Sequence, residues 1–304
     1  MGVSSLSPGW WAFHPYPPQP RSVVELVRTG TLDAELAALV WLLIEGRVSV
    51  IVAAERSGTG KSTVLGALLD FLPPGTRRVE LRGFDEDFDW LPYARELGWP
   101  GREDLERAGR ERVDPASTYL LAAELSDHHP QYTWGDAARV AVRALSIGFG
   151  LGATIHADSL EEVFDRLHRP PVAVTDDELS RLGIVLVLRA VTPAPGDVAD
   201  GPVRRVVAAH YARPMSRDGH GHIQRLPPAV LATWDPHADR FEHFAWGITP
   251  ELALRVGRRA GDFLAEHDRR RDYLAGLAEA GVVDVDAVRA ALDGYRSIAS
   301  THAN

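Results

Sequence analysis

The chain has 304 residues, of which 45% are hydrophobic and 25% charged, a composition usual for a soluble globular protein. Its net charge of −9 gives no basis for a nucleic-acid interface, and the absence of cysteine excludes disulfides and thiolate metal sites. No apolar run is long enough to span a membrane, and residues 1–20 lack the pattern of a secretory signal. We therefore predict a cytoplasmic protein that does not bind nucleic acid.

The order of the predicted elements indicates the class of fold. Residues 1–20 are rich in proline and aromatic side chains, and helical periodicity follows over 22–46 in two pieces. Strands are predicted at 47–53, 77–81, 118–125, 183–191 and 203–212, with a strand and turn at 150–159. Helices are predicted between them at 61–71, 134–148 and 160–168. This alternation predicts an α/β fold with a parallel sheet and helices on both of its faces.

A break in the pattern at 213–224 precedes short strands that run to about Phe244 and three helical segments between 249 and 298. The sequence therefore predicts an N-terminal arm at 1–20, an α/β core at 21–212, and a smaller region at 213–304.

The most informative stretch is VIVAAERSGTGKSTVLGALLDF, residues 50–71. It places a glycine-containing loop between a strand and a helix and is close to the phosphate-binding pattern G-x-x-x-x-G-K-[ST]. The backbone N–H groups of such a loop surround phosphates, the lysine balances their charge, and the following hydroxyl binds Mg²⁺, here Lys61 and Ser62. The residues predicted to bind ATP are Ser57, Gly58, Thr59, Gly60, Lys61, Ser62 and Thr63.

Glu55 departs from this pattern, since it occupies the position of the first glycine. We expect its carboxylate to face solvent or to pair with Arg56, because it would repel a triphosphate. Lys61 argues that the site is genuine, because it is the one lysine among 33 basic residues. Its placement here by chance has odds of roughly one in three hundred.

Hydrolysis needs a carboxylate that orients or deprotonates water, and parallel sheets carry such groups at the C-terminal ends of strands. Glu124 ends a buried strand in this way, and we predict it to be the general base and to contact Mg²⁺, directly or through water. Glu80 and Asp127 are further acids that could position Mg²⁺ or water, and each is equally well explained as an exposed carboxylate at a strand end.

His156 follows another strand at the same edge and is either a catalytic group or a packed polar residue. Two histidine pairs, His128 with His129 and His220 with His222, suggest metal binding. Each pair lacks further ligands in the sequence, so we predict no transition-metal site.

Together these motifs resemble those of the type II/type IV secretion-system ATPases, most closely the Tad/archaeal-type branch that drives pili, archaella and secretion. The likeness runs from about Leu26 to Tyr295. SGTGKST resembles the Walker A loop, DPASTYLLAAELSD the Walker B strand with Glu124, and RRVELRGFDEDF the acidic Asp box with Glu80. ATIHADS resembles the His box with His156, and the tail from HDRRRDYL to ALDGY resembles the C-terminal helices of that branch.

The resemblance implies a RecA-like P-loop NTPase core with a central, mostly parallel sheet at 21–212, followed by a small, mainly helical region. It implies an ATPase that uses ATP and Mg²⁺, with catalytic roles for Glu124, Lys61, His156 and Glu80, and that powers pilus assembly or protein secretion. The implied partners are further copies of the chain in a hexameric ring and a polytopic inner-membrane platform protein. Such a motor is cytoplasmic and reaches the membrane through its protein partners.

Four residues depart from the family pattern. Glu55 and Ala123 replace glycines, Ser126 stands in place of an arginine, and His129 in place of a glutamate. The resemblance also does not extend to the family's large N-terminal domain, which supplies basic residues from a neighbouring subunit, so the sequence does not identify an arginine finger.

These departures favour a second hypothesis, a degenerate member of the family that binds nucleotide as a scaffold or regulatory subunit and hydrolyses little of it. The retained Lys61, Ser62, Glu124 and His156 favour the motor. A P-loop kinase is a third hypothesis, which we rank last because the His box has no role in it.

Overall fold

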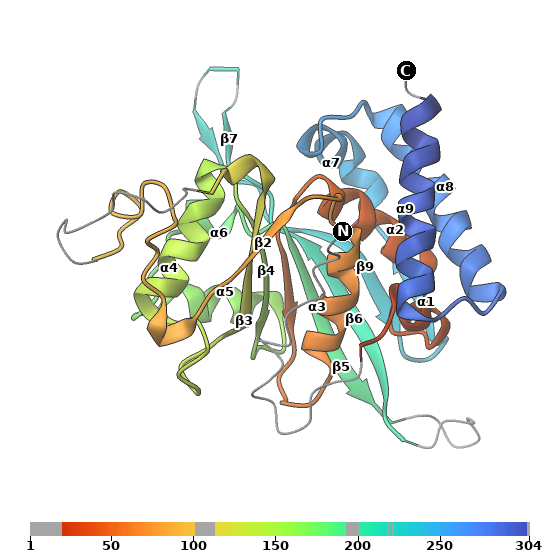
Figure 1. Cartoon of the computed structure of the whole chain (residues 1–304), viewed down its shortest axis with the longest axis horizontal. Coiled ribbons are helices and arrows are strands. Elements are labelled where there is room, and N and C mark those ends of the chain that lie inside the picture. Colours follow the sequence, from red (N-terminus) through yellow and green to blue (C-terminus); the bar gives the residue numbers. More distant parts are fainter. Residues whose placement is uncertain (1–19, 101–112, 193–200, 218, 221, 303–304) are drawn as a thin grey trace, which may run out of the picture.

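The computed structural model describes residues 20–100, 113–192, 201–217, 219–220 and 222–302 (Figure 1). The arm predicted at 1–20 lies almost entirely outside these residues. Eight strands form one sheet in the order β10-β9-β6-β5-β1-β4-β3-β2. Their bounds are β1 Val50–Ala53, β2 Arg77–Glu80, β3 Thr118–Leu125, β4 Gly150–Ile155, β5 Ile184–Val191, β6 Val203–Tyr211, β9 Ala229–Asp235 and β10 Arg240–His243.

The strands from β5 to β2 are all parallel, and β6, β9 and β10 extend the sheet on one side in antiparallel fashion. β1 lies between β5 and β4, the second of the five parallel strands, so the loop that follows it leaves the sheet between two parallel neighbours. The predicted α/β fold with a mostly parallel central sheet is therefore confirmed, and this arrangement agrees with a RecA-like P-loop core.

Nine helices surround the sheet in the part of the chain that the structure describes. Their bounds are α1 Val23–Arg28, α2 Ala34–Glu45, α3 Lys61–Leu68, α4 Gly135–Ala144, α5 Leu160–His168, α6 Asp176–Leu179, α7 Thr249–Arg255, α8 Ala260–Glu279 and α9 Val285–His302. None of the helices within the described ranges is both long enough and apolar enough to cross a membrane.

Two hydrophobic cores lie on the two faces of the sheet, because successive side chains of a strand point to opposite faces. Val50 and Val52 of β1 belong to the core that also contains α2, α3, α8 and α9, whereas Ile51 and Ala53 belong to the core with α4 and α5. Figure 1 shows α8 and α9 on one side of the sheet and α4 on the other. Since β1 is buried on both faces, it reads in the sequence as a continuous apolar run.

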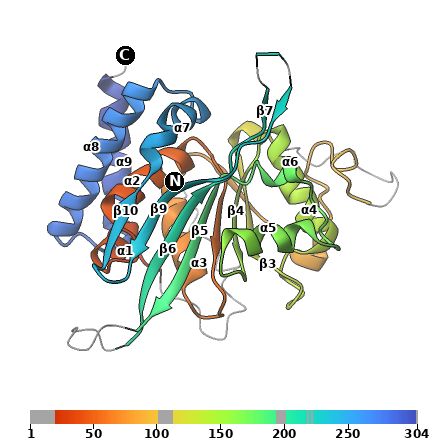
Figure 2. The same cartoon turned by 180° about the vertical axis from the view of Figure 1, so that it is seen from behind.

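The region predicted at 213–304 contains the expected short strands and helices, but it is not separate from the core. β9 pairs with β6 and continues the same sheet across residue 212, and α8 packs on α2. The break in the pattern at 213–224 corresponds to a two-stranded hairpin, β7 Ser216–Arg217 with β8 Ile223–Gln224, which projects from the body of the molecule (Figure 2). The sequence shows where a hairpin interrupts the pattern, but it does not show that the following strand returns to the sheet.

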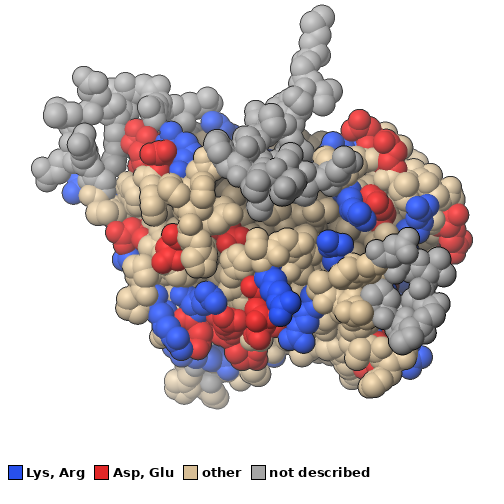
Figure 3. All heavy atoms as spheres, turned by 90° about the horizontal axis from the view of Figure 1, so that it is seen from below, with Lys and Arg blue, Asp and Glu red and all other residues tan. Residues whose placement is uncertain are grey.

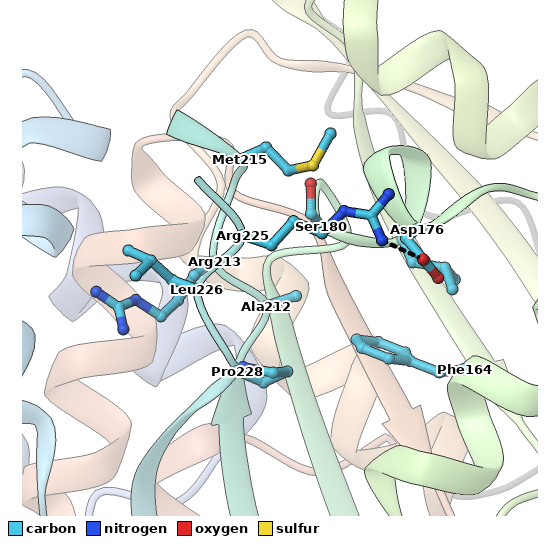
Figure 4. Close-up of a pocket in the computed structure, with 10 residues that line it drawn as sticks. Phe164, Asp176, Ser180, Ala212, Arg213, Met215, Arg225, Leu226 and Pro228 are labelled. Atoms are coloured by element: carbon cyan, nitrogen blue, oxygen red, sulfur yellow. Dashed lines mark hydrogen bonds and ion pairs between the residues drawn. The ribbon is translucent and has the colours of Figure 1, made fainter. Parts of the chain in front are cut away.

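A hollow of about 210 Å³ lies beside α5 and α6 (Figure 4). Phe164, Leu179 and Pro228 give it mostly apolar walls, and Arg225 closes its rim by a 2.6 Å contact with Asp176. None of the predicted site residues lines this hollow. The molecular face in Figure 3 carries acidic and basic side chains next to one another, with no broad area of a single sign.

Candidate functional site

The loop between β1 and α3 has the backbone geometry of an anion cradle. Gly58 and Gly60 have φ angles of 77° and 102°, in the left-handed region that L side chains rarely adopt. Gly60 is the N-cap of α3, and no side chain caps this helix. The first helical hydrogen bond runs from the Val64 N–H to the Gly60 carbonyl, at 2.9 Å. The N–H groups of residues 61–63 therefore precede the helical ladder, in the position where helix N-termini bind phosphate.

Glu55, which replaces the first glycine of the motif, is exposed, as expected from its charge. Its backbone carbonyl lies 3.1 Å from Nδ1 of His156 and connects the loop to the end of β4. The Thr59 hydroxyl donates to the Arg56 carbonyl at 2.7 Å and closes a turn within the loop. The contact from residue 55 is therefore made by its backbone carbonyl, which any residue type supplies, while the exposed side chain of Glu55 faces solvent.

A bulge in β3 carries Glu124. The pairing with β4 matches Ala122 with Ala153 and Leu125 with Ile155, so two residues of β3 stand opposite Thr154 alone. The Thr154 hydroxyl donates to the Ala123 carbonyl at 2.6 Å, which holds the bulge in place. Bulges of this kind re-aim side chains next to functional sites, and here the re-aimed side chain is that of Glu124.

Lys61, Glu124 and His156 meet at the start of α3. The Lys61 Nζ lies 3.5 Å from Oε2 of Glu124 and 3.4 Å from Nδ1 of His156, and the His156 Nε2 lies 3.0 Å from Oε1 of Glu124. Lys61 and Glu124 are only 6% and 7% exposed. Burial lowers the pKa of Lys61, and the neighbouring Glu124 offsets this only in part. The structure therefore brings together three of the four residues predicted to be catalytic.

The contacts of Glu124 leave part of its bonding capacity unused. The 3.0 Å approach of His156 is not in hydrogen-bonding geometry, and Oε1 of Glu124 is a buried atom with no hydrogen-bond partner among the described residues. An unpaired buried carboxylate oxygen costs free energy, so its presence in a folded protein indicates a functional role or a bound water or ion. That oxygen is available for a water molecule, a proton or a cation.

His128 lies beside this group, which the sequence did not indicate. A ring nitrogen of His128, one of His156 and a carboxylate oxygen of Glu124 all lie within 4.8 Å of one another. The Ser126 Oγ lies 3.0 Å from Nδ1 of His128 and accepts the His128 backbone N–H at 3.1 Å. The prediction of no transition-metal site depended on each histidine pair lacking further ligands. In the fold, Glu124 and His156 both lie next to His128, and the proximity of His156 is not evident from the sequence.

Arg204 is a second residue that the sequence analysis missed. It lies near the start of β6, and its Nε donates to the Thr59 carbonyl at 3.2 Å. A Cβ added at Gly60 would lie 3.3 Å from the Arg204 side chain, so Arg204 covers the loop at the point where α3 begins. No local pattern marks this arginine, because its role depends on the β5–β6 hairpin extending past the end of β1.

The remaining predicted residues lie apart from this group. Glu80 is the last residue of β2, two strands away from β4, and burial raises its pKa. Asp127 is mostly exposed, with its Oδ1 3.9 Å from Nε2 of His128. His129 packs against Tyr132 instead of joining the group around Glu124. A direct role for Glu80 remains a prediction.

The residues present fit a nucleotide with Mg²⁺. The uncapped start of α3 and the two left-handed glycines suit a phosphate chain, and Lys61 and Arg204 bring positive charge to it. The half-buried Ser62 follows Lys61 directly, and Glu124 has an unpaired oxygen, so a hydroxyl and a carboxylate are both present as ligands that Mg²⁺ accepts.

No protein-family model matches the chain, but relatives and similar solved structures are found. The Methanocaldococcus jannaschii protein called Uncharacterized protein MJ1287 is 32% identical over 276 residues, which are 84% of this chain and 91% of that protein. Uncharacterized protein MJ0900 from the same organism is 28% identical over 246 residues. These are 80% of this chain but 42% of MJ0900, so the chain spans less than half of that relative.

Two solved structures are similar at a lower level. The Legionella pneumophila ATPase DotB has a TM-score of 0.32 and 13% identity, over 56% of this chain and 47% of DotB. The VirB11 ATPase from the Brucella suis type IV secretion system, in complex with sulphate, has a TM-score of 0.33 and 18% identity, over 70% of this chain and 53% of VirB11. TM-scores this far below 0.5 do not establish a shared function.

Proposed function

The chain belongs to the family of Methanocaldococcus jannaschii protein MJ1287, and we propose that it is a Mg²⁺-dependent ATPase. The observation that carries this proposal is the meeting of Lys61, Glu124 and His156 at the uncapped start of α3. A lysine at a phosphate cradle with a buried carboxylate beside it is the combination that ATP hydrolysis requires. A site that only held phosphate would gain nothing from burying Glu124 with an unpaired oxygen.

Each residue has a distinct role in this proposal. The backbone N–H groups from Ser57 to Thr63 and the Lys61 ammonium bind the phosphates, and Ser62 and Glu124 hold Mg²⁺, which neutralises charge on the phosphate oxygens. Glu124 also accepts the proton of the attacking water. His156 lies beside the Glu124 carboxylate, with Nε2 3.0 Å from Oε1, and its other ring nitrogen contacts the Glu55 carbonyl.

The contact between Lys61 and Glu124 also couples binding to catalysis. Phosphate oxygens compete with Glu124 for the Lys61 ammonium, because both are anions and Lys61 lies within 3.5 Å of the carboxylate. Binding of ATP therefore releases Glu124 from Lys61 and leaves the carboxylate free to act on water. Arg204 contributes by fixing the loop through the Thr59 carbonyl.

We further propose that the ATPase is a motor that powers pilus assembly or protein secretion. The order of Walker A, Walker B and His box motifs supports this proposal, as does the likeness of the helices α8 and α9 to those of the secretion-ATPase branch. The motor would act as a ring of identical subunits, a hexamer, in the cytoplasm, and it would dock on a polytopic inner-membrane platform protein.

The test is Mg²⁺-dependent ATP turnover of the purified chain, compared with Lys61→Ala and Glu124→Gln, with Asp127→Asn as the control for an exposed carboxylate nearby. We expect Lys61→Ala to lose nucleotide binding, Glu124→Gln to bind ATP without turning it over, and Asp127→Asn to match the wild type. The mass in solution, measured with and without ATP, tests the ring.

Equal and negligible turnover by all four proteins would overturn the ATPase proposal. If the wild type nevertheless bound ATP and Lys61→Ala did not, the chain would be the nucleotide-binding scaffold that the substituted motif positions suggest. If the protein were a monomer under every condition, the proposed ring would be wrong, and the proposed ATPase activity would be unaffected.

A further inference from the structure

Three side chains that can bind a metal, Glu124, His128 and His156, come from three places in the chain: the bulge of β3, the loop that follows β3, and the end of β4. One oxygen and two ring nitrogens lie within 4.8 Å of one another. Two histidines and one glutamate, with a fourth position left for water, form a common ligand set for Zn²⁺ in proteins. Mg²⁺ prefers oxygen ligands, so this set suits a different class of cation.

We propose that Glu124, His128 and His156 bind one divalent cation of the zinc class. The cation would compete with the Mg²⁺ proposed at Ser62 and Glu124, because both use Oε1 of Glu124, the oxygen that Lys61 does not contact.

Nε2 of His156 faces the site, because Nδ1 faces the phosphate loop. Nδ1 lies 3.1 Å from the Glu55 carbonyl, which can only accept a hydrogen bond, and 3.4 Å from the Lys61 ammonium, which can only donate one. We assign the proton to Nδ1 because the contact with Glu55 is the shorter of the two. In the neutral ring the lone pair is then on Nε2, which lies 3.0 Å from Oε1 of Glu124. Two atoms with lone pairs do not approach so closely unless a proton or a cation lies between them. Metal-binding histidines are usually oriented by such a contact between the second nitrogen and a carbonyl.

His128 has a similar support. Its Nδ1 lies 3.0 Å from the Ser126 hydroxyl, which is buried and also accepts the His128 backbone N–H. The side chain of His128 is itself 66% exposed, so it can rotate toward the other two ligands without disturbing the core. Bond lengths of about 2.0–2.2 Å to zinc place the ligands of a tetrahedral site about 3.3 Å apart, and a small movement of His128 is sufficient.

Glu124 supplies an independent observation that a ligand belongs here. Its side chain is nine-tenths buried, and its Oε1, which faces His156, has no hydrogen-bond partner within the described part of the chain. Lys61 contacts the other oxygen, Oε2, and leaves Oε1 available. A cation at Oε1 would compensate the buried charge, as a hydrogen bond would do elsewhere.

If the proposed ATPase function holds, the bound cation inhibits it. The cation would occupy the carboxylate oxygen that must accept the proton of water, so that Glu124 could not act as a base. This consequence depends on the proposed function, whereas the binding of the cation does not.

The experiment is a titration of the full chain with Co²⁺ alone, followed by its visible absorption, and then displacement by Zn²⁺. All proteins carry His220→Ala and His222→Ala, which remove a second histidine pair whose rings lie 6.3 Å apart. We expect one Co²⁺ per chain with the intense bands of four-coordinate cobalt. His128→Ala should weaken binding by at least about 10–100-fold, the loss typical when even a supporting group is removed. His129→Ala is the matched control and should bind as the parent does.

Two outcomes would overturn the site: unchanged Co²⁺ affinity in His128→Ala, or equal losses in His128→Ala and His129→Ala. Turnover is measured separately with added Zn²⁺, where inhibition should be lost in His128→Ala. If the parent protein hydrolysed no ATP, the ATPase proposal would fail, and the cobalt spectrum would still decide whether the metal site exists.

Discussion

Two clusters of buried charge in this molecule differ in how completely their carboxylates are hydrogen-bonded. Both oxygens of Glu266 accept hydrogen bonds, although Trp41 Nε1 and Arg270 Nη1 beside it have no hydrogen-bond partner among the described residues. Beneath Trp41, the Arg270 guanidinium donates to Glu266 at 2.8 Å, also donates to Glu45, and stacks over the Trp41 ring at 4.5 Å. Tyr295 donates a further hydrogen bond to Glu266 at 3.2 Å. We call this group the Trp41 network. At the other cluster, Glu124 has one buried oxygen with no hydrogen-bond partner in the described residues, and Lys61 is 3.5 Å away from the other oxygen.

The electrostatic consequences also differ. Burial alone would raise the pKa of Glu266, but the hydrogen bonds and charges of Arg270 and Arg269 outweigh burial and hold that pKa below its usual range. For Lys61, burial outweighs the effect of Glu124, and the pKa falls. The Trp41 network uses its charges to join α2, α8 and α9, and its carboxylate Glu266 is fully paired, whereas the carboxylate of Glu124 retains one oxygen for another molecule.

The largest expected effect is a loss of ATP turnover, which should follow from a substitution at Glu124 and not depend on a loss of stability. Glu124→Gln should lower ATP turnover by about 10²–10⁴-fold, the usual contribution of a positioned acid or base. Its free energy of unfolding should stay within about 1 kcal/mol of the wild type, because the substitution removes a buried, incompletely paired charge, and Lys61, whose pKa burial already lowers, can then lose its proton instead of remaining as an unpaired buried charge. Turnover and urea denaturation of the same preparation test both. A variant that lost stability along with turnover would show that Glu124 is a structural charge like Glu266.

The second prediction concerns the Trp41 network. Arg270→Ala should lower the free energy of unfolding by about 3–5 kcal/mol, because it removes the buried guanidinium that pairs with both Glu266 and Glu45 and stacks on Trp41. Arg271→Ala is the control: that side chain pairs with Asp268 and Asp272 on the surface of the same helix and should change stability by less than about 1 kcal/mol. Urea denaturation curves measure both. Similar free energies of unfolding for the two variants would show that the Trp41 network does not stabilise the fold.

A third test asks whether the loop at Lys61 is held by Arg204. Removal of one hydrogen bond to the Thr59 carbonyl is worth about 0.5–1.5 kcal/mol, so Arg204→Ala should weaken nucleotide binding by up to about tenfold. Arg189→Ala is a matched control, since Arg189 lies on the neighbouring strand and its 3.4 Å hydrogen bond goes to the Asp158 carbonyl instead. Nucleotide titration by calorimetry compares them. Equal affinities for the two variants would mean that Arg204 does not position the loop.

The smallest expected effect is a pH dependence of the free energy of unfolding that arises from His243, the last residue of β10. Burial lowers the pKa of His243, but the hydrogen bond and charge of Asp33, 2.8 Å away, outweigh burial and raise it above 6.5. A raised pKa in the folded state means that this stabilisation is present below pH 6.5 and is lost as the pH rises through the raised value. The loss should be at most about 1 kcal/mol, because Asp33 is partly exposed. The free energy of unfolding, measured from urea curves between pH 5.5 and 8.5, should depend less on pH in His243→Gln than in the wild type. The same pH dependence in both proteins would show that His243 is not the group responsible.

Much of the fold was predictable from the sequence because local chemistry determines it. The bounds of β3 and the start of α3 at Lys61 agree with the predicted strand at 118–125 and helix at 61–71. The buried strands are short apolar runs, and the glycines at 58 and 60 mark a turn of special backbone geometry. The three C-terminal helices were also expected. By contrast, β9 is antiparallel to β6 across a hairpin, and that pairing depends on contacts between residues far apart in the chain.

The same division applies to the candidate site. Lys61, Glu124 and His156 are found from motifs, because each ends a strand or begins a helix in a recognisable pattern. His128 and Arg204 are not. His128 lies in a loop, and its partner histidine, His156, is far away along the chain, while Arg204 lies on a strand whose end extends over the phosphate loop. Whether these two residues reach the site depends on the distances between the ends of different strands, and a single sequence does not give those distances.

The burial of Lys61 has a practical consequence. Its ε-amino group is the one primary amine carried by any side chain of this protein, and it is 6% exposed between Glu124 and His156. Its lowered pKa favours the neutral, nucleophilic form more than in an ordinary lysine. Reagents that acylate amines would therefore label a single side chain, at a rate set by how often this group of residues opens. Because the other 32 basic residues are arginines, the protein carries an internal chemical probe of its own site, free of background from lysines elsewhere.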